Sequence, residues 1–235
     1  MTKLLIATPV RGGELMPEPV AMGYAESVRA LQAMMSVDVI PPTLTYSVDN
    51  IRARNRIAAM FLRREGFAAD ATHLLWWDSD QWPENLRIVE EMLALDVDVV
   101  GAPYTGKRLP LRWVHQHLGD RTTDERGLLE VRWVGFGFTI VSRTCLEKMS
   151  GVARVYSDRL PGGAPPHKVA DIFGLMFFRD NPESDDPTDE LLLSEDNSFC
   201  ERWRQLGGKV HIYTRAGIVV HAGQHGWSAR EMGAP

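Results

Sequence analysis

Two aspartates separated by one serine follow the most apolar short segment of the chain. Residues 73–77 read His-Leu-Leu-Trp-Trp and predict a buried strand, and Asp78-Ser79-Asp80 comes directly after it. Two carboxylates at a strand end can turn toward one point, and carboxylate oxygens suit Mg²⁺ or Mn²⁺ together with substrate phosphate. Asp78 and Asp80 therefore predict a divalent-cation site. A solvated turn is the alternative, since Asp and Ser are common turn formers.

The segments around this motif alternate between apolar strands and amphipathic helices. Strands are expected over 3–10, 37–40, 73–77 and 96–102, and helices over 24–35, 49–62 and 83–95. Asp49 or Asn50 would cap the second helix, whose arginines would face solvent, and Pro83 would begin the third. This alternation predicts an α/β fold with a mostly parallel central sheet flanked by helices. Such sheets bind ligands at the carboxyl ends of their strands, where Asp78 and Asp80 lie.

The second half of the chain is less regular. Expected here are strands over 128–134, 138–142, 209–213 and 218–220. Ser194 would cap a helix that Gly207-Gly208 ends. Residues 157–190 are dense in Pro, Gly and Asp, which predicts a long loop with one short helix.

The composition limits the classes of function. The chain has 235 residues, of which 44% are hydrophobic and 24% charged, which fits one globular domain. The net charge is −5, whereas nucleic-acid binding requires clustered Lys and Arg, so nucleic acid is an unfavoured partner. Cys145 and Cys200 have no disulfide or zinc spacing and favour packed thiols in a reducing cytoplasm. No apolar run reaches the roughly 18 residues of a membrane span.

The ordered set of motifs resembles the GT-A-fold glycosyltransferases, broadly the family 2-like group. The resemblance runs from the first strand to His221 and rests on segments 6–10, 75–80 and 194–200, with Arg202. It implies one GT-A-like domain over 1–235. Residues 1–105 would bind the nucleotide, and residues 106–235, with the 157–190 loop, would bind the acceptor.

The resemblance also implies an activity and a metal. A sugar would pass from a nucleotide-diphosphate donor to a hydroxyl of a glycan, protein or small-molecule acceptor. The D-x-D acids of this family hold the metal and the diphosphate, and a late histidine often completes the site. Asp78, Asp80 and His221 would therefore hold Mn²⁺ or Mg²⁺, with His225 as the competing histidine. A strand-end histidine satisfied by hydrogen bonds is the alternative for His221.

Glu195-Asp196 resembles the acidic pair that supplies the general base in inverting members of the family. We expect Asp196, in preference to Glu195, to deprotonate the acceptor hydroxyl, and inversion would follow. Both acids would also be ordinary in a first helical turn, where an acid stabilises the helix dipole by about 0.3–1 kcal/mol.

The remaining donor contacts that the resemblance implies come from four segments of the chain. They are Thr8, Pro9, Val10 and Arg11; Arg52 and Asn55; Asp78, Ser79 and Asp80; and Gly135, Phe136 and Gly137. Guanidinium groups can pair with phosphate bidentately, although a solvated helix face explains Arg52 equally well. Small residues at 135–137 would let the sugar approach the backbone, with Trp133 or Phe136 offering an apolar face. A bulge packed in the core is the alternative.

Two other functions stay open. A sugar-phosphate nucleotidyltransferase would use a related sheet, but Arg11-Gly12-Gly13 is only a fragment of its Gly-rich signature. A noncatalytic nucleotide- or sugar-binding module would keep the fold without turnover. The sequence leaves the donor, the acceptor (a modified nucleic acid included) and the oligomeric state undetermined.

Overall fold

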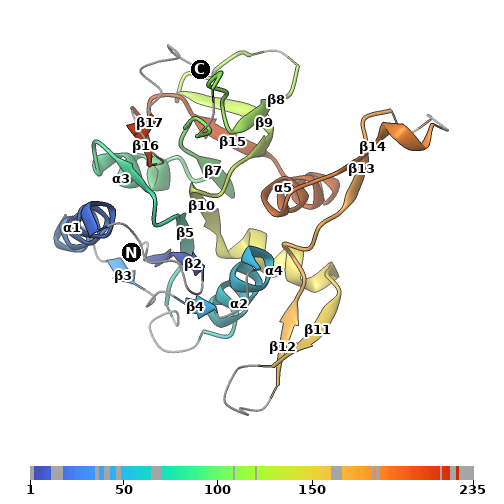
Figure 1. The fold of residues 1–235 in the computed structure, drawn as a ribbon, viewed down its shortest axis with the longest axis horizontal. Helices are drawn as coiled ribbons and strands as arrows, with labels where there is room; N and C mark the ends of the chain where they lie inside the picture. The colour runs from blue at the N-terminus through green and yellow to red at the C-terminus, as the bar shows by residue number, and fades with distance from the viewer. Residues whose placement is uncertain are drawn as a thin grey trace.

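The computed structural model describes residues 3–11, 18–34, 37–39, 43–45, 49–64, 70–107, 109–119, 121–159, 166–181, 183, 186–217, 219–222 and 226–227. At its centre lies an eight-stranded sheet (Figure 1). In spatial order the strands are β3 (Val37–Val39), β1 (Leu4–Ala7), β5 (His73–Trp77), β10 (Phe138–Ser142), β7 (Val99–Gly101), β15 (Val210–Tyr213), β9 (Leu128–Val134) and β8 (His115–His117).

The sheet is mixed, so the prediction of a mostly parallel sheet is wrong. β1 runs parallel to β3 and β5, and β7 runs parallel to β15, whereas the other neighbouring pairs are antiparallel. The cause is β10, which inserts between β5 and β7 and opposes both. β10 keeps the direction of β9, from which only residues 135–137 separate it.

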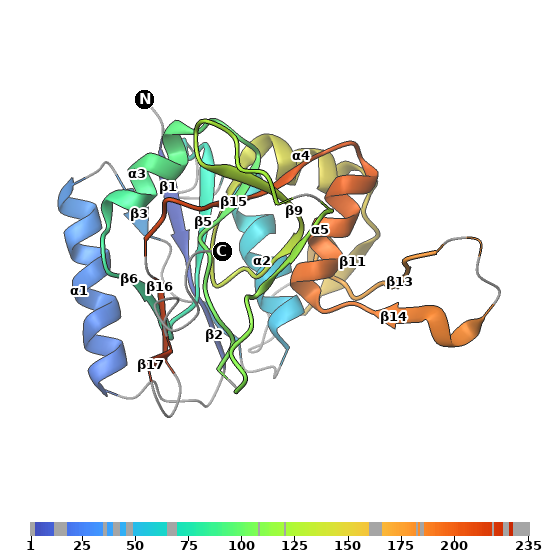
Figure 2. The same cartoon turned by 90° about the horizontal axis from the view of Figure 1, so that it is seen from above.

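Helices cover both faces of the sheet (Figure 2). α1 (Glu18–Met34) and α3 (Arg87–Ala94) pack on one face, and α2 (Asn50–Leu62), α4 (Arg143–Val152) and α5 (Glu195–Gln205) pack on the other. Successive side chains of a strand point to opposite faces. Leu74 and Trp76 of β5 accordingly join the core beneath α2, α4 and α5, and Leu75 and Trp77 join the core beneath α1 and α3. Among the described helices, none is long and apolar enough to cross a bilayer.

Two of the helices begin at the capping residues predicted from the sequence, and a third does not begin where it was predicted. The Asp49 side chain accepts a hydrogen bond from the Ile51 amide at the start of α2, and Ser194 accepts one from the Asn197 amide at the start of α5. The expected helix start at Pro83 is wrong. Pro83 ends a short strand, β6 (Gln81–Pro83), which pairs with β16 (Val219–Ala222).

The expected first strand is split at Thr8. β1 belongs to the main sheet, whereas β2 (Pro9–Arg11) turns away to pair with β4 (Thr43–Thr45). β16 also pairs with β17 (Gly226–Trp227), so β17, β16 and β6 form a small sheet of their own.

The long loop predicted over 157–190 is replaced by two hairpins. β11 (Val155–Asp158) pairs with β12 (His167–Ala170), and β13 (Phe177–Arg179) pairs with β14 (Glu190–Leu192) after a 3-10 helix, η2 (Pro187–Asp189). The short helix expected in this segment is η2. The β13–β14 hairpin projects from the body as an arm (Figures 1 and 2).

Candidate active site

The D-x-D turn lies at the carboxyl end of β5, as expected. The Asp78 amide donates to the Gly137 carbonyl at 2.8 Å, and the Gln81 amide donates to the Asp78 carbonyl at 3.1 Å. These bonds fix the turn, with Ser79 and Asp80 in it, between the start of β10 and β6. The side chains of Asp78 and Asp80 are 31% and 37% exposed, so both are partly buried and partly open to solvent.

Arg54 connects Asp78 to the acids of α5. The Arg54 side chain is only 2% exposed, and its Nη2 lies 3.3 Å from Asp78 Oδ1. Its Nε lies 3.5 Å from Asp196 Oδ1 and 4.0 Å from Glu195 Oε1. We call these four residues the Arg54 cluster. The structure thus brings Asp78 and the expected base together through one buried cation.

An aromatic floor supports the Arg54 guanidinium. Its carbon lies 5.2 Å from the centre of the Trp76 ring, 5.8 Å from that of Phe136 and 6.0 Å from that of Phe173. Burial alone would lower the pKa of Arg54, but Asp196, Asp78 and Glu195 outweigh it and raise that pKa. Arg54 therefore stays charged in an apolar setting.

Among the arginines of α2, sequence reasoning selected only Arg52 as a donor contact, because it expected several of these arginines to face solvent. That expectation is wrong for Arg54 and Arg56, which are 2% and 8% exposed, because acids from other elements pair with both. The signal was present in the spacing. Arg54 follows Ile51 by three positions and precedes Ile57 by three, so it lies on the apolar face of the helix.

The remaining bonds of the Arg54 cluster orient Asp196. Its Oδ2 accepts a hydrogen bond from the Phe136 amide at 3.0 Å. Burial raises the pKa of Asp196 to about 6, against the opposing effect of Arg54. Burial likewise raises the pKa of Asp78 to about 7, again opposed by Arg54. Acids crowded in one partly desolvated place are typical of functional sites.

Asp80 belongs to a second group, with His221 and Lys107. The pairing of β16 with β6 sets His221 opposite Gln81, which follows Asp80 directly. His221 Nε2 lies 3.8 Å from Asp80 Oδ1, and Lys107 forms an ion pair with Asp80 Oδ2. His221 Nδ1 lies 2.8 Å from the Thr105 carbonyl, which can only accept, so Nδ1 carries the proton. Burial lowers the pKa of His221, against the opposing effects of the Thr105 carbonyl and Asp80.

The three predicted metal ligands, Asp78, Asp80 and His221, do not converge on one point. In the described part of the chain, no three His, Cys, Asp or Glu side chains form a group that could hold a metal ion. Asp78 turns to Arg54 while Asp80 faces His221. Asp80 and His221 do lie next to each other, and of the two groups the carboxylate is the kind of ligand that Mg²⁺ and Mn²⁺ prefer. A histidine whose other nitrogen is tied to a carbonyl is the usual arrangement for a ligand. His225 lies outside the described residues.

The Gly135-Phe136-Gly137 turn is packed in the core. A Cβ at Gly135 would lie 2.2 Å from Tyr104 Oη, and one at Gly137 would lie 1.9 Å from Gln81 Nε2. Phe136 is fully buried and Trp133 is 8% exposed, so neither presents an apolar face to a sugar. The turn contributes through its backbone instead, because its amides bond Asp196 and Tyr104.

The other predicted donor residues are engaged elsewhere or only partly described. The Thr8 hydroxyl is buried and bonds to that of Tyr24. Asn55 donates to Asp171 and accepts from the Phe173 amide, and Arg52 pairs with Asp158 on β11. For the remaining three, Pro9 is half-buried, and the side chains of Val10 and Arg11 lie outside the description.

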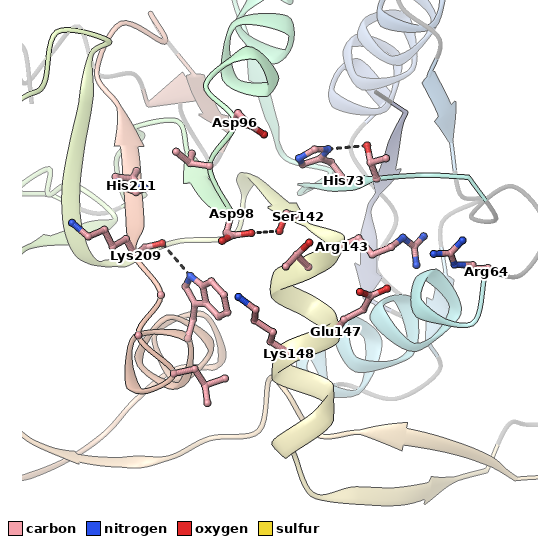
Figure 3. A pocket seen from close by; sticks show the side chains of 17 residues that line it. Arg64, His73, Asp96, Asp98, Ser142, Arg143, Glu147, Lys148, Lys209 and His211 are labelled. Carbon is pink, nitrogen blue, oxygen red and sulfur yellow. Dashed lines mark hydrogen bonds between the residues drawn. The ribbon is translucent and has the colours of Figure 1, made fainter. Parts of the chain in front are cut away.

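A separate groove of about 660 Å³ lies at the opposite end of the strands (Figure 3). Its lining includes His73 at the start of β5 and Ser142 at the end of β10. Asp98, Arg143 and Lys148 also line it. The Asp98 side chain accepts a hydrogen bond from Ser142 there. None of the residues lining it was predicted as a site residue.

Comparisons with known proteins describe the fold and not the activity. No family model matches the sequence, and no curated protein matches it. Among solved structures, A197 from STIV is similar with a TM-score of 0.51 and 17% identity, covering 94% of this chain and 86% of that one. A glycosyltransferase involved in the glycosylation of the major capsid of PBCV-1 has a TM-score of 0.37 and 11% identity, over 63% of each chain.

The first likeness shows a shared fold, and the second is too distant to carry an argument. Across its described residues, the chain is an α/β protein whose mixed central sheet is flanked by five helices and whose fold is similar to that of A197 from STIV.

Proposed function

We propose that the chain is a glycosyltransferase that moves a sugar from a nucleotide-diphosphate donor to an acceptor hydroxyl. The supporting observation is the convergence of two charged groups at the carboxyl end of β5. Asp78 and Asp196 meet through Arg54, and Asp80 meets His221. The mixed α/β fold is compatible with this chemistry, and the sequence motifs favour it.

The proposed step is an in-line displacement at the anomeric carbon. The acceptor oxygen forms a bond to that carbon, and its proton passes to the Asp196 carboxylate. The bond from the carbon to the diphosphate breaks, and its electron pair leaves with the diphosphate. Arg54 and the Phe136 amide hold the base in place, and attack from the side opposite the leaving group inverts the sugar.

In this proposal Asp80 and His221 would hold Mn²⁺ or Mg²⁺, with Asp78 beside them. The cation supplies neutralisation of the negative charge that develops on the departing diphosphate. The chain's own contribution is positional. The Thr105 carbonyl orients His221, and the Gly137 carbonyl orients the turn that carries Asp78.

The proposal is tested by donor binding followed by turnover. Wild type is screened by thermal shift against UDP-, GDP-, CDP- and dTDP-sugars with and without Mn²⁺, since a ligand bound by the native state alone raises the melting temperature. We expect one nucleotide class to stabilise the protein in a metal-dependent way. Asp80→Asn should lose that shift, and Asp196→Asn should keep it while losing donor turnover.

Asp70→Asn is the matched control, because Asp70 is an exposed acid paired with Lys3 away from the D-x-D turn. It should behave as wild type. Three results would contradict the proposal. They are a donor shift that survives without metal in Asp80→Asn, release of pyrophosphate from NTP and sugar phosphate, and donor binding with no turnover in wild type.

A further inference from the structure

A second groove opens beside the Asp80–His221 pair. Its volume is about 610 Å³, and its lining residues are Gly106, Lys107, Leu109, Pro110, Arg112 and His221. Lys107 and His221 are the two partners of Asp80, so the groove begins where the proposed cation and diphosphate would lie. We call it the Arg112 groove.

A hydrogen-bonded hairpin builds the wall of this groove. The Gly106 amide donates to the Arg112 carbonyl at 2.9 Å, and the Val114 amide donates to the Tyr104 carbonyl at 3.0 Å. A β-bridge joins Thr105 to Trp113 between them. Arg112 is therefore held opposite Gly106 by the backbone, on a defined wall of the groove.

Tyr104 contacts both a lining residue of the groove and the turn beside the proposed base. The Tyr104 ring packs edge-on against His221 with 5.4 Å between ring centres. Its hydroxyl accepts a hydrogen bond from the Gly137 amide, and the adjacent Phe136 amide holds Asp196. Tyr104 thus connects a residue of the groove wall, His221, to the turn that holds the base.

The charge of the groove is one-sided. Among the lining residues that the structure describes, none is acidic, and Lys107 and Arg112 are cations. Lys107 is occupied by Asp80, whereas the exposed Arg112 side chain has no hydrogen bond or ion pair within the described part of the chain. Leu109, which is 75% exposed, and Pro110 give the lining an apolar part. A free guanidinium beside an apolar surface suits a ligand that joins a carboxylate or phosphate to a sugar ring.

We propose that the acceptor is an acidic saccharide, whose carboxylate or phosphate binds Arg112 while its hydroxyl is directed past Tyr104 toward Asp196. This inference rests on the proposed function, because it assigns the acceptor of the same site. Arg112 is here a specificity-determining residue that sets which acceptor enters and takes no part in donor binding.

The test uses wild type, Arg112→Gln and Arg87→Gln on an array of acidic glycans, bearing uronate, sialate or phosphate, and neutral glycans. Arg87 is an exposed arginine at the start of α3 and serves as the matched control. We expect wild type and Arg87→Gln to bind acidic glycans. Arg112→Gln should bind them about tenfold more weakly, as expected for loss of one charge-assisted pair.

Donor binding separates this inference from the proposed function. The metal-dependent donor shift should be unchanged in Arg112→Gln, because the inference assigns Arg112 to the acceptor and not to the donor. Preference for neutral glycans, no glycan binding at all, or equal binding by Arg112→Gln would overturn the acidic-acceptor inference while leaving the donor result intact. A weaker donor shift in Arg112→Gln would also overturn it, because the groove would then belong to the donor.

Discussion

Helix α2 carries arginines at three alternate positions, and the fold uses them for two purposes. Arg54 faces the acids of the D-x-D turn and α5, whereas Arg52 and Arg56 both pair with Asp158 on the β11–β12 hairpin. Residues four apart lie on one face of a helix, and residues two apart do not. Arginine is therefore used on both faces of α2: Arg54 contacts the acids of the candidate site, and Arg52 and Arg56 hold the hairpin on the other face.

The two clusters differ in their balance of charge. Around Asp158, two guanidiniums meet one carboxylate, and the bonds are completed by the Arg159 carbonyl, to which Arg52 and Arg56 also donate. In the Arg54 cluster, one guanidinium meets three carboxylates, with two raised carboxyl pKa values. A satisfied network is typical of structural anchoring. The Arg54 cluster instead has more carboxylates than cations, and such an excess of acids is typical of a functional site.

The largest expected effect comes from Arg54→Met. Removing the cation leaves Asp78, Glu195 and Asp196 without their shared partner, and breaking a buried pair this way costs about 3–5 kcal/mol of unfolding free energy. Donor turnover should fall at least about a hundredfold in the molecules that remain folded, since a misplaced base loses that much. Urea unfolding and steady-state rates measure the two effects. Arg54→Lys, which keeps the charge, should recover stability more than turnover.

Equal recovery of stability and turnover by Arg54→Lys would show that the cluster requires a charge and no particular geometry. In that case the distinction between the two faces of α2 would fail, because Arg54 would be an anchor of the same kind as Arg56.

Much of this site could be predicted from local sequence. The D-x-D turn followed from an apolar strand that ends in two acids, and the start of α5 followed from Ser194 as a cap. Arg54 could not be distinguished from Arg52 by residue type. Its partners come from β5 and α5, which lie far along the chain, so its role depends on tertiary contacts that no local pattern contains.

Asp158→Asn tests the anchoring face. The Asp158 side chain is 2% exposed, so its loss leaves Arg52 and Arg56 without an acceptor charge. We expect a decrease of about 3 kcal/mol in unfolding free energy, as for buried hydrogen bonds to charged groups. Donor turnover per folded molecule should stay at the wild-type value. Urea unfolding of Asp70→Asn gives the baseline for an exposed acid, where the change should stay below about 1 kcal/mol.

The hairpin that carries Asp158 could not be predicted from the sequence. Four short strands lie within or beside a segment dense in turn formers, and each strand has only three or four residues. At that length no alternation of apolar and polar residues can develop. The ion pairs that join β11 to α2 link Asp158 to Arg52 and Arg56, which lie about a hundred residues away in the chain.

The smallest expected effect is a pH dependence that belongs to the anchoring face. Burial alone would raise the pKa of Asp158, but hydrogen bonds from Arg56 and Arg52, and their charges, hold that pKa below the ordinary value of 3.8. A carboxyl whose pKa is lower in the folded protein adds stability above its unfolded pKa and loses it as the pH falls through the folded one. The stability difference between wild type and Asp158→Asn should therefore be constant from pH 6 to about pH 5 and shrink below about pH 4. Urea unfolding at pH 6, 5, 4 and 3 measures it, and a difference that stays level down to pH 3 would mean that hydrogen-bond geometry, and not the charge of Asp158, holds the hairpin on α2.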